Sequence, residues 1–299
     1  MSKKIYISII IFLTYLFFQN IILNQKLIKK DIKICLCVIA KNENLYAREF
    51  IEHYKKLGYS KIFIYDNNEI GGEYFENVIN DYIKSGYVKI IDYRSTTKAN
   101  PQYEAYKDCY TNNNKLYHWL SFYDMDEYLE LNKKYENIQE FLNDKIFDYC
   151  QNIKINWVMY MNKNVLYYEN KSLYERMKVF ENNEHIKSTV RGNLSENYWD
   201  KYSNPHTSSS NFTSCSSSGK IIKFDSPFNY PPDYTKAKLK HYYYKSFEEY
   251  CLKMKRGQAD RDKSTNINII NHNYQELFNR FRNDSQKIII MKKIFNISL

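Results

Sequence analysis

Two aspartates spaced two residues apart, Asp124 and Asp126, are the residues of this chain best suited to chemistry. They end an apolar, strand-like run that begins at Trp119 and reads WLSFYDMDEY. Side chains alternate between faces along a strand, so both carboxylates are expected on one face. Such carboxylates repel unless a cation lies between them, and their hard oxygens suit Mg²⁺ or Mn²⁺, which commonly share a diphosphate with the protein. The spacing favours a metal-dependent site for a nucleotide diphosphate, although a solvated loop after a strand would give the same pattern.

The segment before these aspartates alternates between strand and helix patterns. The segment 34–40 is a continuous apolar run, typical of a strand buried on both faces, and 61–65 and 87–92 are also expected to be strands. The intervening segments carry apolar residues at helical spacing and stop at Gly58 and Gly86. A further helix is expected around 102–110. This alternation predicts an α/β, Rossmann-like fold with a mostly parallel sheet flanked by helices.

Polar residues follow three of the predicted strands where each strand ends. They are Lys41-Asn42-Glu43, Asp66-Asn67 and the aspartate pair. In open α/β sheets ligands bind at the carboxyl edge of the strands, so a binding site is expected there. Asn42 could instead be a helix cap and Asp66 a turn residue.

Composition narrows the function classes. The 299 residues suffice for one large domain or two small ones, and 17% aromatic residues argue against disorder. With only 7 Gly, the chain has no glycine-rich phosphate loop. The net charge of +10 suggests an anionic partner, but no basic run with interleaved aromatics supports nucleic-acid binding, and we expect none. The six cysteines form no metal pattern and are expected to be core thiols, with one disulfide possible but not assignable.

The N-terminal segment is almost wholly apolar from Ile5 to Leu23 and is flanked by lysines. Its length is close to the roughly 20 residues that span a bilayer, and small residues of a signal-peptide cleavage site are missing, so we expect a transmembrane anchor. Basic residues on both sides leave the orientation open. Sequons at Asn170, Asn193 and Asn211 permit a lumenal domain.

The C-terminal third carries a second group of signals. Lys238 to Tyr244 is expected to be a strand that contains His241. Ser246 and Glu249 form a capping-box pattern that opens a helix. Basic residues at the end of that helix could meet phosphates or complement the helix C-terminus, the latter being favoured for Lys255. The apolar, basic tail after residue 288 is expected only to pack or to form a surface helix.

In order along the chain, these motifs resemble glycosyltransferase family 92 and its wider family-2-like GT-A relatives. The resemblance covers about residues 34–262 and is carried by the sequences VIAKNE, FIEHY, IYDN, WLSFYDMDEY, NPH and HYYYKS. It implies a GT-A fold, a nucleotide-sugar donor, a divalent metal and inversion at the anomeric carbon. Membrane anchoring through one N-terminal helix, with a lumenal Golgi or secretory-type domain in eukaryotes, is also implied. A Ser-rich insert at 207–218 departs from the family pattern and leaves the acceptor in doubt.

The resemblance also implies roles for individual residues. Asp66 would hold the nucleobase or ribose, Asp124 the ribose or a metal-bound water, and Asp126 the metal, while Ala40 and Glu43 would line the nucleotide pocket. His241 would complete a metal set of Asp124, Asp126 and His241, and its softer imidazole favours Mn²⁺ over Mg²⁺. His206 competes for that role, and either histidine could be a core residue. An inverting enzyme needs a carboxylate base, for which Glu196 and Asp200 are the candidates.

The expected organisation is therefore an anchor and short stem at 1–30, a GT-A domain at 31–265 and a C-terminal tail at 266–299. The expected function is metal-dependent sugar transfer from a nucleotide diphosphate, UDP being favoured, to a glycan or glycoconjugate hydroxyl. Two alternatives stay open: an inactive membrane-tethered binding relative and a basic nucleic-acid binder.

Overall fold

The computed structural model describes residues 10–17, 19, 31–95, 100–161, 164–194, 198–199, 204–207, 211–222, 226–257 and 266–297. The chain forms two compact units, Met1–Ile32 and Lys33–Leu299. In the first unit, residues 10–17 are helical and expose large apolar side chains such as Ile11 and Phe17. No helix within the described ranges is long and apolar enough to cross a membrane. The rest of the predicted span from Ile5 to Leu23 lies outside those ranges.

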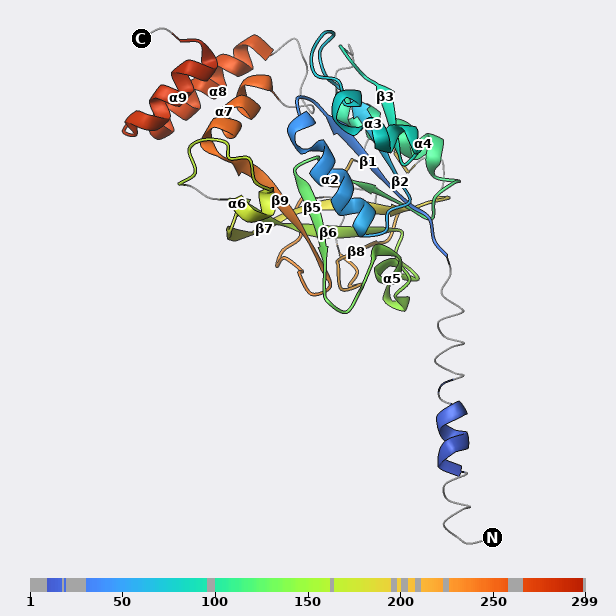
Figure 1. Ribbon diagram of the computed structural model, residues 1–299. Helices are drawn as coiled ribbons and strands as arrows, with labels where there is room; N and C mark the ends of the chain where they lie inside the picture. Colours follow the sequence, from blue (N-terminus) through green and yellow to red (C-terminus); the bar gives the residue numbers. More distant parts are fainter. Residues whose placement is uncertain are drawn as a thin grey trace. The chain divides into compact units, whose positions relative to one another are not determined.

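The second unit is built on a nine-stranded sheet in the order β3-β2-β1-β4-β7-β6-β9-β5, with β8 paired to β6 (Figure 1). Its first half is parallel, as the strand–helix alternation predicts, and contains β1 (Ile34–Ala40), β2 (Lys61–Asp66), β3 (Val88–Asp92) and β4 (Trp119–Phe122). The strand β1 is central in this half and is buried at every position, which explains its unbroken apolar run.

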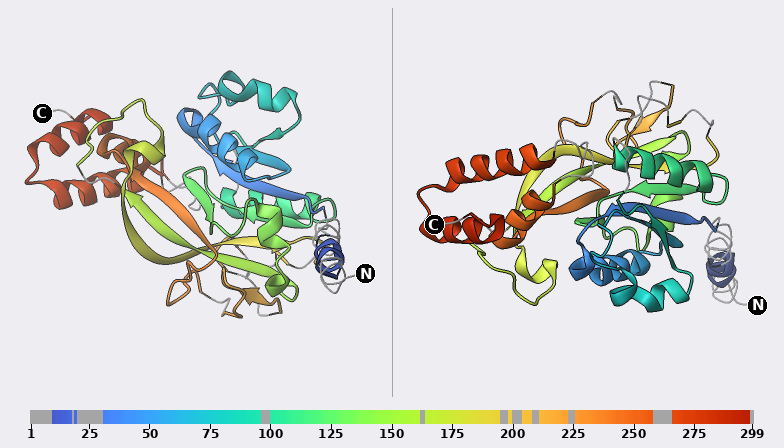
Figure 2. Two further views of the ribbon diagram at one scale, coloured as in Figure 1. Left: turned by 60° about the horizontal axis from the view of Figure 1, so that its bottom comes forward. Right: turned by 90° about the horizontal axis from the view of Figure 1, so that it is seen from above.

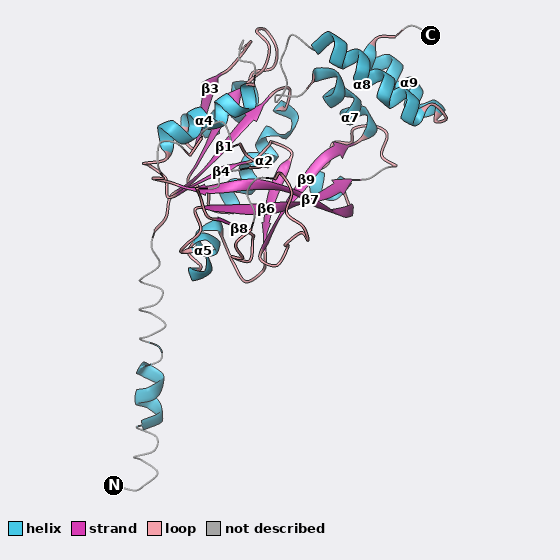
Figure 3. Cartoon of the chain, turned by 180° about the vertical axis from the view of Figure 1, so that it is seen from behind, coloured by secondary structure: helices cyan, strands magenta, loops and turns pink. Residues whose placement is uncertain are grey.

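The second half of the sheet is mixed, so the expectation of a mostly parallel sheet is wrong there. It contains β5 (Glu127–Leu131), β6 (Asn152–Met161), β7 (Val179–Arg191), β8 (Ser214–Cys215) and β9 (Ala237–Lys245). The strand β7 runs antiparallel to both β4 and β6, and β5 runs antiparallel to β9, whereas β6 and β9 are parallel. Figure 3 shows β6, β7 and β9 side by side, in agreement with their pairing.

Helices cover the parallel half on both faces. The helix α4 (Pro101–Asn113) buries Ala105, Tyr106 and Cys109 against one face of β1 and β4. The helix α2 (Asn44–Lys56) buries the predicted apolar stripe and reaches β5, where the Phe50 ring meets the Tyr128 ring edge-on. The shorter elements are α3 (Glu76–Lys84), α5 (Ile138–Leu142), a 3₁₀ turn at Lys145–Phe147 and α6 (Leu173–Arg176).

Two disulfides tie these layers together. Cys37 of β1 bonds Cys109 of α4, and Cys150 bonds Cys215 of β8. The expectation of mostly free core thiols is therefore wrong for four of the six cysteines, and only Cys35 and Cys251 remain unbonded and buried. The pairing could not be read from the sequence because the partners are 72 and 65 residues apart.

Three C-terminal helices group together at one end of the sheet (Figure 2). They are α7 (Phe247–Arg256), α8 (Asn266–Phe281) and α9 (Ser285–Phe295). The helix α7 opens with the expected capping box, in which Ser246 and Glu249 exchange side-chain to backbone hydrogen bonds. Buried Leu277, Ile290 and Met291 of α8 and α9 pack around Cys251 of α7. This packing fixes α7 at the end of β9, where the site described next is found.

Candidate active site

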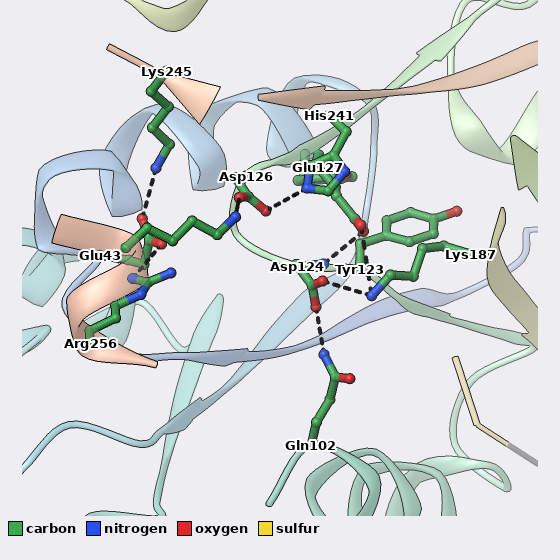
Figure 4. Close-up of polar contacts among 12 residues, drawn as sticks. Glu43, Gln102, Tyr123, Asp124, Asp126, Glu127, Lys187, His241, Lys245 and Arg256 are labelled. Carbon is green, nitrogen blue, oxygen red and sulfur yellow. Dashed lines mark hydrogen bonds and ion pairs between the residues drawn. The ribbon is translucent and has the colours of Figure 1, made fainter. Parts of the chain in front are cut away.

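The aspartate pair lies in a turn rather than in a strand. The strand β4 ends at Phe122 and β5 begins at Glu127, and the Glu127 amide donates to the Asp124 carbonyl at 3.0 Å. The expectation that both carboxylates share one strand face is therefore wrong, and each meets its own set of partners (Figure 4). The antiparallel pairing of β5 with β9 sets Glu127 opposite His241, which brings His241 beside Asp126.

Asp126 is buried between an imidazole and an ammonium. Its Oδ1 lies 3.4 Å from Nε2 of His241, and its Oδ2 lies 2.5 Å from Nζ of Lys253 on α7. Burial alone would raise the pKa of Asp126, but Lys253 and His241 outweigh it and hold the pKa well below its usual range. Burial lowers the pKa of His241, so its imidazole is neutral at neutral pH and Lys253 carries the charge that balances Asp126.

Asp124 is held by three donors. Its Oδ1 accepts from Gln102 Nε2 at 3.0 Å and from the Tyr106 hydroxyl at 3.1 Å, and its Oδ2 accepts from Lys187 Nζ at 2.8 Å. Burial would raise the pKa of Asp124, yet the Lys187 ammonium lowers it below its usual value. The carboxylate is thus a fixed anion whose oxygens point toward the donors of α4 and β7.

Burial disfavours the charged form of the neighbouring Glu127 carboxyl. Its side chain is fully buried, and burial raises its pKa well above the usual value despite Lys187 Nζ at 3.7 Å from its Oε1. Its Oε2 accepts the Asp124 amide at 2.9 Å, which helps to fix the turn. Lys187 Nζ therefore faces both carboxyl groups and lies closer to Asp124, at 2.8 Å, than to Glu127, at 3.7 Å.

Glu43, predicted to line a nucleotide pocket, lies just after β1 between two cationic side chains. Its carboxylate meets Lys245 Nζ at 3.1 Å and Arg256 Nη1 at 2.7 Å. Burial would raise the pKa of Glu43, but these two cations lower it. Ala40 ends β1 at this edge and is buried beside Asp66 in the strand register.

Asp66 is also at the predicted edge, but its carboxylate is already engaged. Arg94 Nη2 donates to Oδ2 at 2.6 Å, while the backbone and side chain of Asn68 donate to Oδ1. Arg94 also donates to the Glu69 carbonyl at 2.9 Å. In this arrangement Asp66 organises the loop after β2, which is the turn-forming role that the sequence left open beside nucleotide binding.

The two competing histidines have different surroundings. The His206 ring nitrogen Nδ1 is 2.7 Å from the Ile186 carbonyl, and burial lowers the pKa of His206 to about 3. Its ring meets one side of Trp157, with centroids 5.7 Å apart, while His241 packs on Trp157 at 4.3 Å. Of the two, His241 is the one that lies against Asp126. Glu196 and Asp200, the predicted bases, lie outside the described residues.

A divalent metal fits this donor set only as a two-ligand site completed by substrate. Within the ranges that the structure describes, no group of three His, Cys, Asp or Glu side chains is placed to hold a metal. The Asp126 carboxylate and the neutral His241 imidazole do face each other, and His241 Nδ1 is buried without a hydrogen-bond partner among the described residues. Mg²⁺ and Mn²⁺ sites of this kind use one or two protein ligands plus phosphate oxygens and water. The metal set predicted from sequence is thus reduced to Asp126 and His241, with Asp124 facing Lys187 instead.

Several residues of this site escaped sequence reasoning. Lys187 stands in a buried strand segment, where a lysine is unusual enough to signal a buried ion pair. Lys253 was missed, although it shares a helix face of α7 with Arg256, which the sequence did offer as a possible phosphate contact; nothing local indicates that this face meets the aspartates. Gln102 and Lys245 carry no local signal at all.

Comparisons with known proteins were made for the chain as a whole. The model of glycosyltransferase family 92 matches residues 30–287. A glycosyltransferase family 92 protein of Oryza sativa subsp. japonica is 29% identical over 101 residues, which are 34% of this chain and 17% of the rice protein. The chain thus matches less than a fifth of that curated relative's length.

Among solved structures, a TarS fragment of S. aureus (residues 1–349) has 12% identity and a TM-score of 0.34, covering 88% of this chain and 80% of that one. A second S. aureus TarS structure has 11% identity and a TM-score of 0.37, covering 88% of this chain and 43% of that one. Mannose-1-phosphate geranyltransferase from Thermus thermophilus has 9% identity and a TM-score of 0.27, covering 54% of this chain and 50% of that one. Likenesses at these TM-scores say nothing about function.

Proposed function

The chain belongs to glycosyltransferase family 92, and on this premise we propose that it is a glycosyltransferase of GT-A type. It moves a sugar from a nucleotide-diphosphate sugar, a UDP-sugar being favoured, to a hydroxyl of a glycan or glycoconjugate, with inversion. The observation that carries the proposal is the convergence of Asp126, His241 and Glu43, far apart in sequence, at the carboxyl edge of the sheet. That edge is where α/β folds of this kind bind nucleotides.

In this proposal Asp126 and His241 hold Mn²⁺ or Mg²⁺. The metal supplies positive charge for the leaving diphosphate, whose oxygens gain negative charge as the glycosidic bond breaks. His241 suits the role because burial lowers the pKa of its imidazole and its Nε2 already faces the Asp126 carboxylate. Imidazole also biases the choice toward Mn²⁺.

The surrounding residues of the proposed site bind and orient the donor. Asp124, kept anionic and fixed by Lys187, is placed to accept from a ribose hydroxyl or from a water of the metal. Ala40 and Asp66 line the nucleotide side at the ends of β1 and β2. Inversion also requires a carboxylate to take the acceptor proton from the opposite face, and Glu196 and Asp200 remain the proposed bases.

We further propose that the N-terminal apolar segment tethers the enzyme to a membrane and that the catalytic unit lies in an oxidising, secretory-type lumen. The two disulfides support the second part, because such bonds persist in oxidising compartments and are rare in the cytosol.

The test is a thermal-shift panel of nucleotide sugars with and without Mn²⁺, followed by transfer assays with the donor that binds. A ligand at 100 times its Kd should add about 2.7 kcal/mol to the stability of the folded state. Asp126→Asn should abolish the Mn²⁺-dependent shift and lower turnover by roughly 10²–10³-fold, because one charged ligand of the transition-state site is lost.

A matched control is Asp81→Asn, which removes an exposed carboxylate paired with Arg48 far from the site. This variant should keep the shift and the turnover. The proposal fails if no nucleotide sugar shifts the wild type in Mn²⁺. A wild type that binds donor but transfers to no acceptor would instead favour an inactive binding relative.

A further inference from the structure

The helix α7 presents two cations, Lys253 and Arg256, to the site described above. Lys253 Nζ contacts Asp126, and its ammonium also lies 3.7 Å from the centre of the Tyr243 ring. Arg256 forms an ion pair with Glu43 and also donates a hydrogen bond to the backbone carbonyl of Lys41. Lys253 is thus the cation that pairs with the carboxylate expected to bind metal.

The charges of this cluster do not balance. Glu43 and Asp126 supply two carboxylates, and Lys245, Lys253 and Arg256 supply three cations that pair with them. Glu43 is already satisfied by two of these cations. A divalent cation that binds Asp126 would compete with the Lys253 ammonium for one carboxylate. The extra positive charge of the cluster would then lie on Lys253.

Lys253 is also the cation best able to move. Its side chain is 16% exposed, more than the 7% of Lys245 and close to the 19% of Arg256. A lysine ammonium sits on a flexible four-carbon stem, whereas an arginine fork such as that of Arg256 is held by several bonds at once.

We propose that Lys253 is an exchangeable counter-ion of the metal site. This inference rests on the proposed function, and it assigns Lys253 two alternating partners. Without donor, its ammonium neutralises Asp126. When Mn²⁺ and a nucleoside diphosphate bind together, the ammonium leaves Asp126 and binds a diphosphate oxygen, so that no like charges remain in contact.

This exchange predicts strong coupling between the two ligands. Mn²⁺ alone must displace the ammonium and leave it without a partner, so it binds weakly. A diphosphate offers the displaced ammonium a new anion, so each ligand raises the affinity for the other by the same factor.

The experiment measures Mn²⁺ binding by electron paramagnetic resonance, with and without UDP, and UDP binding by calorimetry in EDTA. Lys253→Met should bind Mn²⁺ alone roughly 10-fold more tightly than wild type, because a competing charge next to Asp126 is gone. It should bind UDP in EDTA roughly 10-fold more weakly, because a charge-assisted hydrogen bond is lost. The factor by which UDP raises Mn²⁺ affinity should fall accordingly.

Two further variants separate this role from structure and from net charge. Lys255→Met removes a lysine two residues away whose Nζ donates to the Ile294 carbonyl, and it should leave both affinities near wild type. Lys253→Arg keeps the charge and should retain most of the factor by which UDP raises Mn²⁺ affinity. If Lys253→Met does not fold, Lys253→Arg becomes the test, and loss of that factor in Lys253→Arg would overturn the proposal.

The outcomes are distinct. If wild type binds both ligands and Lys253→Met leaves Mn²⁺ affinity unchanged or lower, Lys253 is a structural ion-pair partner and the inference is wrong while the proposed function stands. If wild type binds neither Mn²⁺ nor UDP, both the proposed function and this inference are refuted.

Discussion

Replacing Lys187 by methionine tests whether the buried lysine sets the charge state of Asp124. Its side chain is fully buried, with Nζ 2.8 Å from Asp124 Oδ2. Two unit charges at that distance attract by about 6 kcal/mol at an effective dielectric of ~20, before the cost of removing both from water. Breaking a buried pair by deleting one partner typically costs about 3–5 kcal/mol. The lower end, about 3 kcal/mol, is expected because the Asp124 side chain is 30% exposed and keeps its hydrogen bonds from Gln102 and Tyr106.

The assay is a double-mutant cycle in urea at pH 7 with Lys187→Met, Asp124→Asn and the double variant. Each single variant leaves one charge without its partner, so the double variant should be about as stable as either single one, with a coupling energy of roughly 2–3 kcal/mol. The pairing would be refuted if the losses in the free energy of unfolding were additive in the double variant. A loss below about 1 kcal/mol for Lys187→Met would refute it as well.

The stability difference between wild type and Lys187→Met should also depend on pH. The lowered pKa of Asp124 contributes stability that is present above the unfolded value of about 3.9 and is lost as the pH falls through the folded value. Losing Lys187 raises that folded pKa. The stability difference between wild type and Lys187→Met should therefore narrow as the pH is lowered from 7 through about 4.

Two other predictions concern the disulfides and the N-terminal segment. Replacing Cys150 and Cys215 by alanine opens a loop of 65 residues and should lower the free energy of unfolding by about 4 kcal/mol. Reductant should produce a comparable loss in the wild type, and an unchanged urea midpoint in dithiothreitol would contradict the bonds. Removal of residues 1–30 should convert a protein that sediments with membranes into one that stays in the supernatant without detergent. Full-length protein that extracts freely in buffer would rule out the anchor.

The parallel half of the fold was predictable from local pattern alone. Unbroken apolar runs such as 34–40 identify strands covered on both faces, and helical spacing that ends at Gly58 identifies the intervening helix. These signals are local because burial on both faces demands apolar residues at successive positions. The capping box at Ser246 was also predictable, because its side-chain to backbone hydrogen bonds join residues only three apart.

The antiparallel half was not predictable in the same way. Its strands pair residues far apart in sequence, and β7 is exposed along its first residues, so its pattern carries no clear period. The assumption that an Asp-x-Asp sequence continues a strand also failed at Asp124. A turn was equally compatible with those residues, and the β5–β9 register decided it.

The sequence by itself determined which groups gather at one edge of the sheet, since that follows from where each strand ends. That rule identified Glu43 and Asp126, whereas His241 was expected from the family resemblance, and the structure places it beside Asp126. The tertiary structure alone decided how these charges are balanced. Lys187, Lys245, Lys253 and Arg256 come from β7, β9 and α7, and an ion pair depends on the separation of two charges in space, which sequence spacing does not record.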